Sequence, residues 1–208
     1  MNNDNIKLST NFIIADSDYA DRVAFDLIVN FERMLNRRIP AASLDQWLVD
    51  IALDGGMRKP AGDTPTQVVL VHDTAHTKLE NFSPSVYDSD INRKAFKDNT
   101  LGEFAVNAIA VGSDIVSKET YITELIKTVN AHPEVERLMI IPDSEDEETF
   151  AAIRKALDGG SPDRRTTLFA MQPLAPGQWR QEVLGYSLMN AMGIKGSELH
   201  GGSSENDF

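Results

Sequence analysis

Apolar residues along the chain alternate between two patterns. Short runs in which every residue is apolar, such as the VVLV segment at 68–71, predict strands that are buried on both faces of a sheet. Between these runs, apolar residues recur every three or four positions with polar residues off that stripe, as from Val23 to Leu35, which predicts amphipathic helices. Strands that alternate with helices, at spacings long enough for crossover connections, predict a mostly parallel sheet.

The fold expected from these patterns is a three-layer α/β/α sandwich of the Rossmann-like kind, with a mostly parallel sheet of about five strands. The strands are expected at 12–15, 67–72, 104–111, 138–141 and 167–171. The helices are expected at 18–37, 43–52, 117–129, 145–157 and 179–192, with one short helix around 89–96 in a segment that has no clear period.

The chain length is that of one domain. It has 208 residues, of which 41% are hydrophobic, enough to build a core around one sheet. We therefore expect a single α/β domain over 1–194. The remaining segment, 195–208, is polar and rich in glycine, so it cannot bury enough apolar area to fold and is expected to be a disordered tail.

The composition limits the compartments in which the protein is expected and the partners that it is expected to bind. No apolar run approaches the roughly 20 residues that span a bilayer, and the amino-terminal residues lack the pattern of a secretion signal. The chain contains no cysteine, which excludes disulfides and thiolate metal sites and suits a reducing compartment. We expect a cytoplasmic protein with no membrane partner.

The net charge of −12 makes nucleic acid an unlikely partner, because the long-range field opposes binding to phosphate backbones. A local basic patch could outweigh this mean charge, and the candidates for one are Arg33, Arg37 and Arg38, or Arg164 and Arg165. Solvated side chains at a helix end and in a loop are the simpler interpretation of these arginines.

Acidic residues follow three of the predicted strands. Asp16 and Asp18 follow the first, His72 and Asp73 end the second, and Asp143 follows the fourth. The carboxyl ends of parallel strands share one edge, so these acids could converge, with Asp16, Asp18 and Asp143 as ligands of Mg²⁺ or Mn²⁺ for phosphate chemistry and Asp73 as a further ligand or base. The competing interpretation is that each acid caps the next helix or closes a turn.

Several motifs of known chemistry are absent from the sequence. No GxGxxG or GxxxxGK[ST] loop follows a strand, which weighs against nucleotide cofactors. GxSxG is absent as well, and there is no cysteine, so the commonest nucleophiles are missing and serine hydrolysis has no support. No cofactor is expected apart from the divalent cation of the metal hypothesis.

The segments ADSDYAD at 15–21 and IPDSEDEETF at 141–150 resemble the acidic motifs of PIN and NYN-type nuclease domains. Those domains are α/β sandwiches with an aspartate after the first strand and a DxD-like element after the fourth. The second segment departs from the pattern because it lacks the usual glycine before its acid. The resemblance implies a metal-dependent nuclease or phosphoesterase that uses Asp16, Asp18 and Asp143.

A second resemblance covers nearly the whole chain. FIIADSDYADRVAFDLIVNFERMLNRRIP at 12–40, VVLVHD at 68–73, NTLGEF at 99–104 and LGYSLMNAMGI at 184–194 are similar to an uncharacterised family of Bacteroidetes proteins, classed as a domain of unknown function. This resemblance implies one compact cytoplasmic domain. It brings no established activity and no catalytic residue.

Three functions therefore stay open. The first is a protein without catalytic activity that binds a protein partner or associates with itself. Apolar side chains on helices, such as Trp47 and Trp179, would supply the contact surface, although core packing explains both tryptophans at least as well. The second is the metal-dependent phosphoesterase or nuclease. The third is a small-molecule site without chemistry, at the point of the sheet where the strand order reverses.

Overall fold

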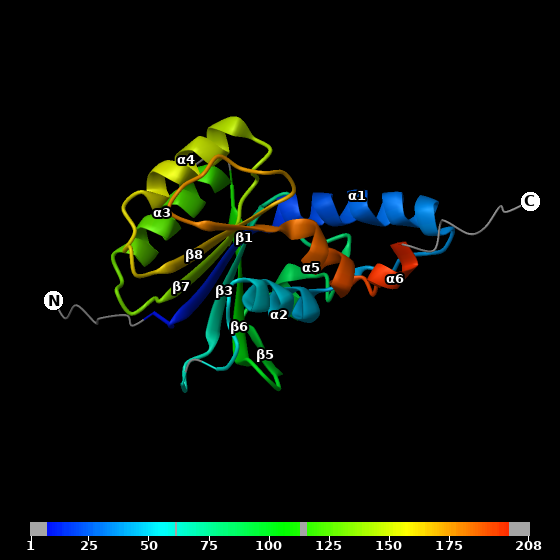
Figure 1. Ribbon diagram of the computed structural model, residues 1–208, viewed down its shortest axis with the longest axis horizontal. Helices are drawn as coiled ribbons and strands as arrows, with labels where there is room; N and C mark the ends of the chain where they lie inside the picture. The colour runs from blue at the N-terminus through cyan, green and yellow to red at the C-terminus, as the bar shows by residue number, and fades with distance from the viewer. Residues whose placement is uncertain (1–7, 61, 113–115, 200–208) are drawn as a thin grey trace, which may run out of the picture.

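The computed structural model describes residues 8–60, 62–112 and 116–199, and its centre is a seven-stranded, mostly parallel sheet (Figure 1). The strand order is β5-β6-β3-β1-β7-β8-β9, and only β5 runs antiparallel to its neighbour. The strands are β1 (Asn11–Asp16), β3 (Thr66–Asp73), β5 (Lys94–Asp98), β6 (Gly102–Val111), β7 (Arg137–Ile141), β8 (Arg165–Ala170) and β9 (Arg180–Val183). A separate small sheet pairs β2 (Ala42–Ser43) with β4 (Phe82–Ser83).

The expectation of about five strands was wrong, because the sheet has two further strands at its edges. The segments KAFKD of β5 and RQEV of β9 contain only exposed or half-buried residues and no apolar run. An edge strand is paired on one side only and needs little burial, so the pattern that reveals a central strand is missing there. The expected helix at 89–96 is instead a π-helical turn, η1 (Tyr87–Ile91), followed by β5, and the last expected helix begins only after β9.

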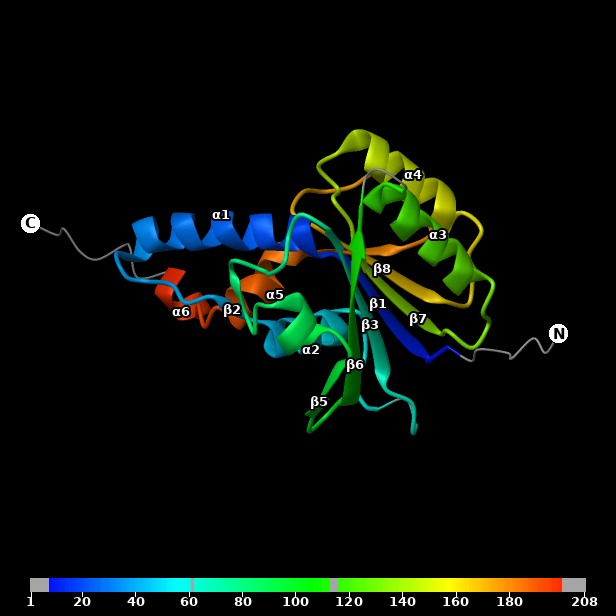
Figure 2. The same cartoon turned by 180° about the vertical axis from the view of Figure 1, so that it is seen from behind.

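Helices cover both faces of the sheet, as the two opposite views show (Figures 1 and 2). On one face lie α3 (Lys118–Asn130) and α4 (Glu147–Leu157), and on the other lie α1 (Ser17–Leu35), α2 (Leu44–Asp54) and α5 (Leu184–Ala191). Each face has its own hydrophobic core. Trp47 belongs to the larger core at 1% exposure and packs on Phe82, so it is a core residue and not a docking side chain.

The position of β1 at the centre of the sheet explains its continuous apolar run, because both of its faces are covered. Its residues alternate between the two cores, with Ile13 and Ala15 on the side of α1 and with Phe12 and Ile14 on the side of α3. All six residues are buried. A strand covered on both faces has no position for a polar side chain until it ends, and the first acid, Asp16, stands at that end.

The carboxyl ends of β1, β3 and β7 lie at one edge of the sheet, because β1 pairs in parallel with β3 on one side and with β7 on the other. This confirms the prediction that Asp16, the last residue of β1, and Asp143, which follows β7, lie at the same edge. β1 is followed in the sheet by β3 and β6 on one side, whereas the chain crosses through α3 to reach β7 on the other. The strand order therefore reverses between β1 and β7.

The described residues end in a short helix, α6 (Gly196–Leu199), beside the far end of α1. The Glu198 carboxylate accepts hydrogen bonds from the Arg37 guanidinium at 2.7 and 3.0 Å. Residues 200–208 of the predicted tail lie outside the described part of the chain. No helix among the described residues is long and apolar enough to cross a membrane.

Candidate functional site

The site is built around two aspartates at the end of β1 and a lysine that joins them. Asp16 caps α1, where its carboxylate accepts the Tyr19 amide N–H at 3.1 Å. The Lys118 ammonium donates to Asp16 Oδ1 at 2.9 Å and to Asp18 Oδ2 at 2.7 Å. The same Asp18 oxygen accepts the backbone N–H of Asp73 at 2.8 Å. One lysine from α3 thus neutralises part of the charge of two acids that are 100 residues or more away in the chain.

Burial acts against hydrogen bonding in setting the charges of these acids. Asp16 is only 5% exposed, and its burial raises its pKa above the usual value in spite of Lys118. Burial also opposes ionisation of Asp18, but hydrogen bonds from Lys118, the Asp73 amide and His76 outweigh it and lower the pKa of Asp18. The two carboxylates in turn raise the pKa of Lys118 against the effect of its own burial. Asp18 is therefore the firmly ionised member of the pair.

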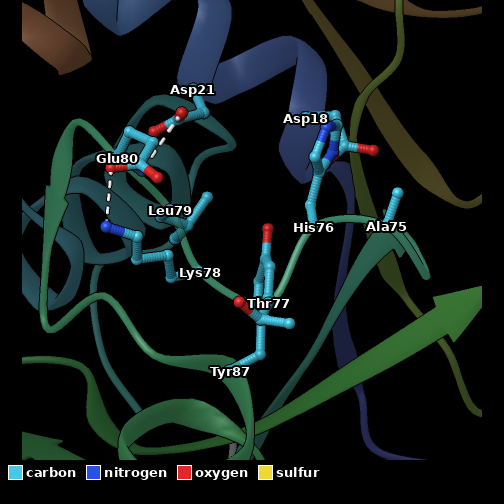
Figure 3. Close-up of a pocket in the computed structure, with 9 residues that line it drawn as sticks. All are labelled: Asp18, Asp21, Ala75, His76, Thr77, Lys78, Leu79, Glu80 and Tyr87. Atoms are coloured by element: carbon cyan, nitrogen blue, oxygen red, sulfur yellow. Dashed lines mark hydrogen bonds and ion pairs between the residues drawn. The ribbon is translucent and has the colours of Figure 1, made fainter.

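A pocket of about 210 Å³ opens beside Asp18 (Figure 3). It is lined by the start of α1 and by the loop after β3, namely Asp18, Asp21, Ala75, His76, Thr77, Lys78, Leu79 and Glu80, together with Tyr87 of η1. Figure 3 shows Asp18 and His76 on one side of the pocket and Asp21, Lys78 and Glu80 on the other. The pocket lining thus includes three carboxylates, one lysine and one histidine.

Hydrogen bonds hold the pocket walls in place. His76 donates through Nδ1 to Asp18 Oδ1 at 2.8 Å. The Asp21 carboxylate accepts the backbone N–H groups of Glu80 at 3.2 Å and Asn81 at 2.8 Å, which ties the loop to α1. Lys78 pairs with Glu80 at 2.9 Å. The negative side chains are positioned by the protein itself, before any ligand is present.

The floor of the pocket is an aromatic stack. The rings of Tyr87 and His72 lie parallel with centroids 3.7 Å apart. The Tyr87 hydroxyl donates to Ser17 Oγ at 2.8 Å, because the Ser17 hydroxyl itself donates to the Val71 carbonyl at 3.0 Å. His72 is buried and donates to the Asp73 carbonyl at 3.0 Å. These contacts leave His72 in a packing role beneath the pocket.

Asp73 and Asp143 make local contacts of a different kind. Asp73 Oδ1 accepts the Ala75 amide N–H at 2.7 Å, which closes the turn after β3. Arg22 of α1 binds Asp143 at 3.2 Å and Glu145 at 3.3 Å. Each of these acids is satisfied by the protein in its immediate surroundings.

Asp16, Asp18 and the Asp73 backbone are therefore brought together by Lys118 and the end of β3, whereas Asp143 joins α1 through Arg22. Within the described ranges, no group of three or more His, Cys, Asp or Glu side chains is arranged to hold a metal ion. The assignment of Asp16, Asp18 and Asp143 as metal ligands stays a prediction.

Sequence reasoning missed Lys118, Asp21, His76 and Tyr87. Lys118 carried a usable signal, because it is the first residue of a helix capped by Ser117. The positive end of the helix dipole disfavours a cation at that position, so a lysine there suggests a carboxylate partner from elsewhere in the fold. The loop residues carried no comparable signal.

Neither the curated proteins nor the solved structures contain a match to this chain. A model of a protein family matches residues 5–199, nearly the whole chain, which agrees with the resemblance to a domain of unknown function. The chain belongs to the family of unknown function DUF6621.

Proposed function

We propose that this protein is a non-catalytic binding protein whose pocket beside Asp18 takes a small molecule with a positively charged amino group. The observation that carries the proposal is the set of three carboxylates, Asp18, Asp21 and Glu80, around a pocket of about 210 Å³. A concave site with a few fixed polar groups, located beyond the carboxyl ends of parallel strands, is the usual place for a small ligand in this kind of sheet.

The charge of the pocket favours a cation over an anion. Lys78 is already paired with Glu80, and Lys118 is already paired with Asp16 and Asp18. The protein as a whole has a net charge of −12, which adds a favourable long-range field for a cationic ligand. An ammonium group would meet the Asp21 carboxylate, which the loop amides hold in place, and would share the Glu80 carboxylate with Lys78.

Binding is favoured over chemistry because the acids at the end of β1 are engaged by donors of the protein. Asp16 accepts from Lys118 and the Tyr19 amide, and Asp18 accepts from Lys118, His76 and the Asp73 amide. A general base or a nucleophile needs an oxygen free to approach the substrate. These contacts support a role for both acids in shaping the site.

The strand order supports the finer fold assignment that we propose, a three-layer α/β/α sandwich of the Rossmann-like kind. Numbered along the chain, the parallel strands β6-β3-β1-β7-β8-β9 have the order 3-2-1-4-5-6 of that fold. A single domain over 1–194 with a disordered tail, a cytoplasmic location and an origin in the Bacteroidetes remain predictions that rest on the sequence. So does the expectation of a protein partner or self-association.

A divalent-metal phosphoesterase or nuclease of the PIN/NYN type is the second candidate function. It is favoured by one observation, that Asp16 and Asp143 lie at the carboxyl ends of neighbouring parallel strands, at the point where the strand order reverses. The Lys118 ammonium then lies where a cation between Asp16 and Asp18 would bind, so Mg²⁺ or Mn²⁺ would have to displace it.

Calorimetric titration with 1,4-diaminobutane tests the binding function, with uncharged 1,4-butanediol as the ligand control. We expect saturable binding of the diamine alone. Glu80→Gln should weaken it about threefold, the value of one exposed charge pair, whereas Glu124→Gln should leave it unchanged. Glu124 is a matched control because it is also 63% exposed and also paired with a lysine. Equal binding of diamine and diol would overturn the proposal.

Thermal unfolding with Mg²⁺ or Mn²⁺ separates the two functions. If the metal candidate is correct, the cation stabilises the wild type by about 2.7 kcal/mol at a hundredfold excess over its dissociation constant, and Asp16→Asn abolishes this gain. If the binding function is correct, wild type and Asp16→Asn respond equally to the cation.

A further inference from the structure

A second pocket, at the opposite edge of the sheet, has a volume of about 530 Å³ and the opposite charge. Among the described residues, four cationic side chains line it, Arg58, Lys59, Arg137 and Arg165, together with one carboxylate, Glu136. The pocket lies where β1, β7 and β8 begin, at the amino ends of the strands. Such a concentration of positive charge is unexpected in a protein with a net charge of −12.

The sheet register aligns two of these arginines. Asn11, Arg137 and Arg165 are partners across β1, β7 and β8, so their side chains leave the same face of the sheet in one row. Like charges directly opposite one another on neighbouring strands repel. A structure that keeps two arginines in this arrangement has an unbalanced positive charge at that point.

The arginines are bonded to neutral groups. Arg137 Nη1 donates to the Asn11 side-chain oxygen at 2.7 Å, and Arg58 Nη1 donates to the Leu53 and Met57 carbonyls at 2.7 and 2.6 Å. Arg137 Nε is buried and has no hydrogen-bond partner among the described residues. Among the residues that the structure describes, no ion pair joins Arg58, Lys59, Arg137 or Arg165 to a carboxylate.

Gly56 lies next to two of the guanidinium groups. Its backbone has a φ of +91°, a conformation that residues with a side chain rarely adopt. A glycine, which has no Cβ, suits this position. Arg165 Nη1 lies 3.5 Å and Arg137 Nε lies 3.9 Å from where that Cβ would be. Donors from two strands thus approach one small volume, and one of them has no partner.

We propose that this pocket binds the phosphate group of a small phosphorylated molecule, with Arg137 and Arg165 as its principal ligands. The planar guanidinium group matches phosphate oxygens with paired donors, and a tetrahedral dianion accepts hydrogen bonds from several directions at once. The volume exceeds that of one phosphate and leaves room for the organic part. Burial lowers the pKa of Arg137, repulsion from Arg165 and Arg58 lowers it further, and a bound dianion would relieve that repulsion.

The proposal is independent of the pocket beside Asp18, and the two sites can be tested separately. Calorimetric titration of the full chain with pyrophosphate at low salt tests it directly. We expect saturable binding at one site, weakened about tenfold in Arg165→Gln, since one charge-assisted hydrogen-bonding group is lost. Arg33→Gln serves as the matched control, because Arg33 is an exposed arginine on α1, outside this pocket, and should bind as the wild type does.

The melting temperature of Arg165→Gln without anion shows whether the variant is folded, and we expect it to equal or exceed that of the wild type. Lys59→Gln, a change of an exposed loop residue, should also weaken pyrophosphate binding. Absence of saturable binding would overturn the proposal, as would equal weakening by Arg165→Gln and Arg33→Gln. Tighter binding of a single-stranded RNA oligomer that depends equally on Arg33 would overturn it as well, in favour of a nucleic-acid surface.

Discussion

The carboxyl edge of the sheet, where its parallel strands end, and the amino edge, where they begin, differ in how their charged side chains are paired. At the carboxyl edge, Asp16 and Asp18 share the Lys118 ammonium, and further donors complete their contacts. At the amino edge, Arg137 and Arg165 stand side by side without a carboxylate partner among the described residues. Removing one partner of a buried ion pair leaves an uncompensated charge and destabilises the folded chain, whereas unpaired like charges destabilise it until a ligand neutralises them. Mutations that remove a charge should therefore lower the free energy of unfolding at the carboxyl edge and raise it at the amino edge.

The largest effect is expected from Lys118→Met, which keeps the length of the side chain and removes its charge. Asp16 is buried, so the variant leaves a carboxylate in the interior without its cation, and the free energy of unfolding should fall by about 3 kcal/mol. Urea unfolding at neutral pH measures this loss.

Lys127→Met is the matched control for this prediction. Lys127 is also in α3 and pairs with Glu124, but both side chains are exposed, so the loss should stay below about 1 kcal/mol. Equal losses in Lys118→Met and Lys127→Met would contradict the buried-pair interpretation of the carboxyl edge.

A second difference, between the central and the outermost strands of the sheet, explains which parts of the fold could be predicted. The strands β1, β3 and β7 were predicted because burial on both faces requires continuous apolar runs, while β5 and β9 were missed because edge strands do not need them. The shared edge of Asp16, Asp18 and Asp73 followed from parallel strands alone. The partnership with Lys118 did not, because it depends on how the crossover helix α3 packs across the sheet.

The neighbouring residues Arg164 and Arg165 illustrate the same limit at the amino edge. The sequence offers them as one basic patch, but their side chains have different surroundings. The Arg164 guanidinium is buried and donates to the Val135 and His132 carbonyls at 2.8 Å, whereas Arg165 lines the pocket beside Arg137. Arg165 is the first residue of β8 and is in register with Arg137 of β7. This position distinguishes it, as the arginine available to a ligand, from the structural Arg164.

The second largest effect is expected from Asp18→Asn, which removes the firmly ionised acid of the carboxyl edge. It loses charge-assisted hydrogen bonds from Lys118 and His76, so the free energy of unfolding should fall by about 2 kcal/mol at pH 7. The folded-state pKa of Asp18 is lowered, so its stabilisation is present above the unfolded value of about 3.9 and is lost as the pH falls through the folded pKa. The deficit of the variant should shrink below about pH 4.

Asp16→Asn should show the opposite pH dependence. The pKa of Asp16 is raised in the folded state, so its protonated form favours folding at low pH, and this advantage is lost as the pH rises through the folded pKa. Asparagine retains the helix cap, so the charge is the main difference. The deficit of this variant should grow as the pH falls. Thermal unfolding of both variants between pH 3 and 7 measures this, and parallel curves would contradict the opposite directions of the two pKa shifts.

The smallest effect, and the one of opposite sign, is expected from Arg165→Gln in a low-salt buffer without phosphate. Removing one of two like charges that face each other on β7 and β8 relieves repulsion, so the free energy of unfolding should rise by about 0.5 kcal/mol. Added salt should shrink this gain, because screening weakens the same repulsion in the wild type. Added phosphate should reverse it, since the wild type then gains a ligand that the variant binds less well. Urea unfolding in the three buffers measures the sign in each, and a loss of stability without anion would mean that Arg165 is held by contacts of its own, as Lys118 is.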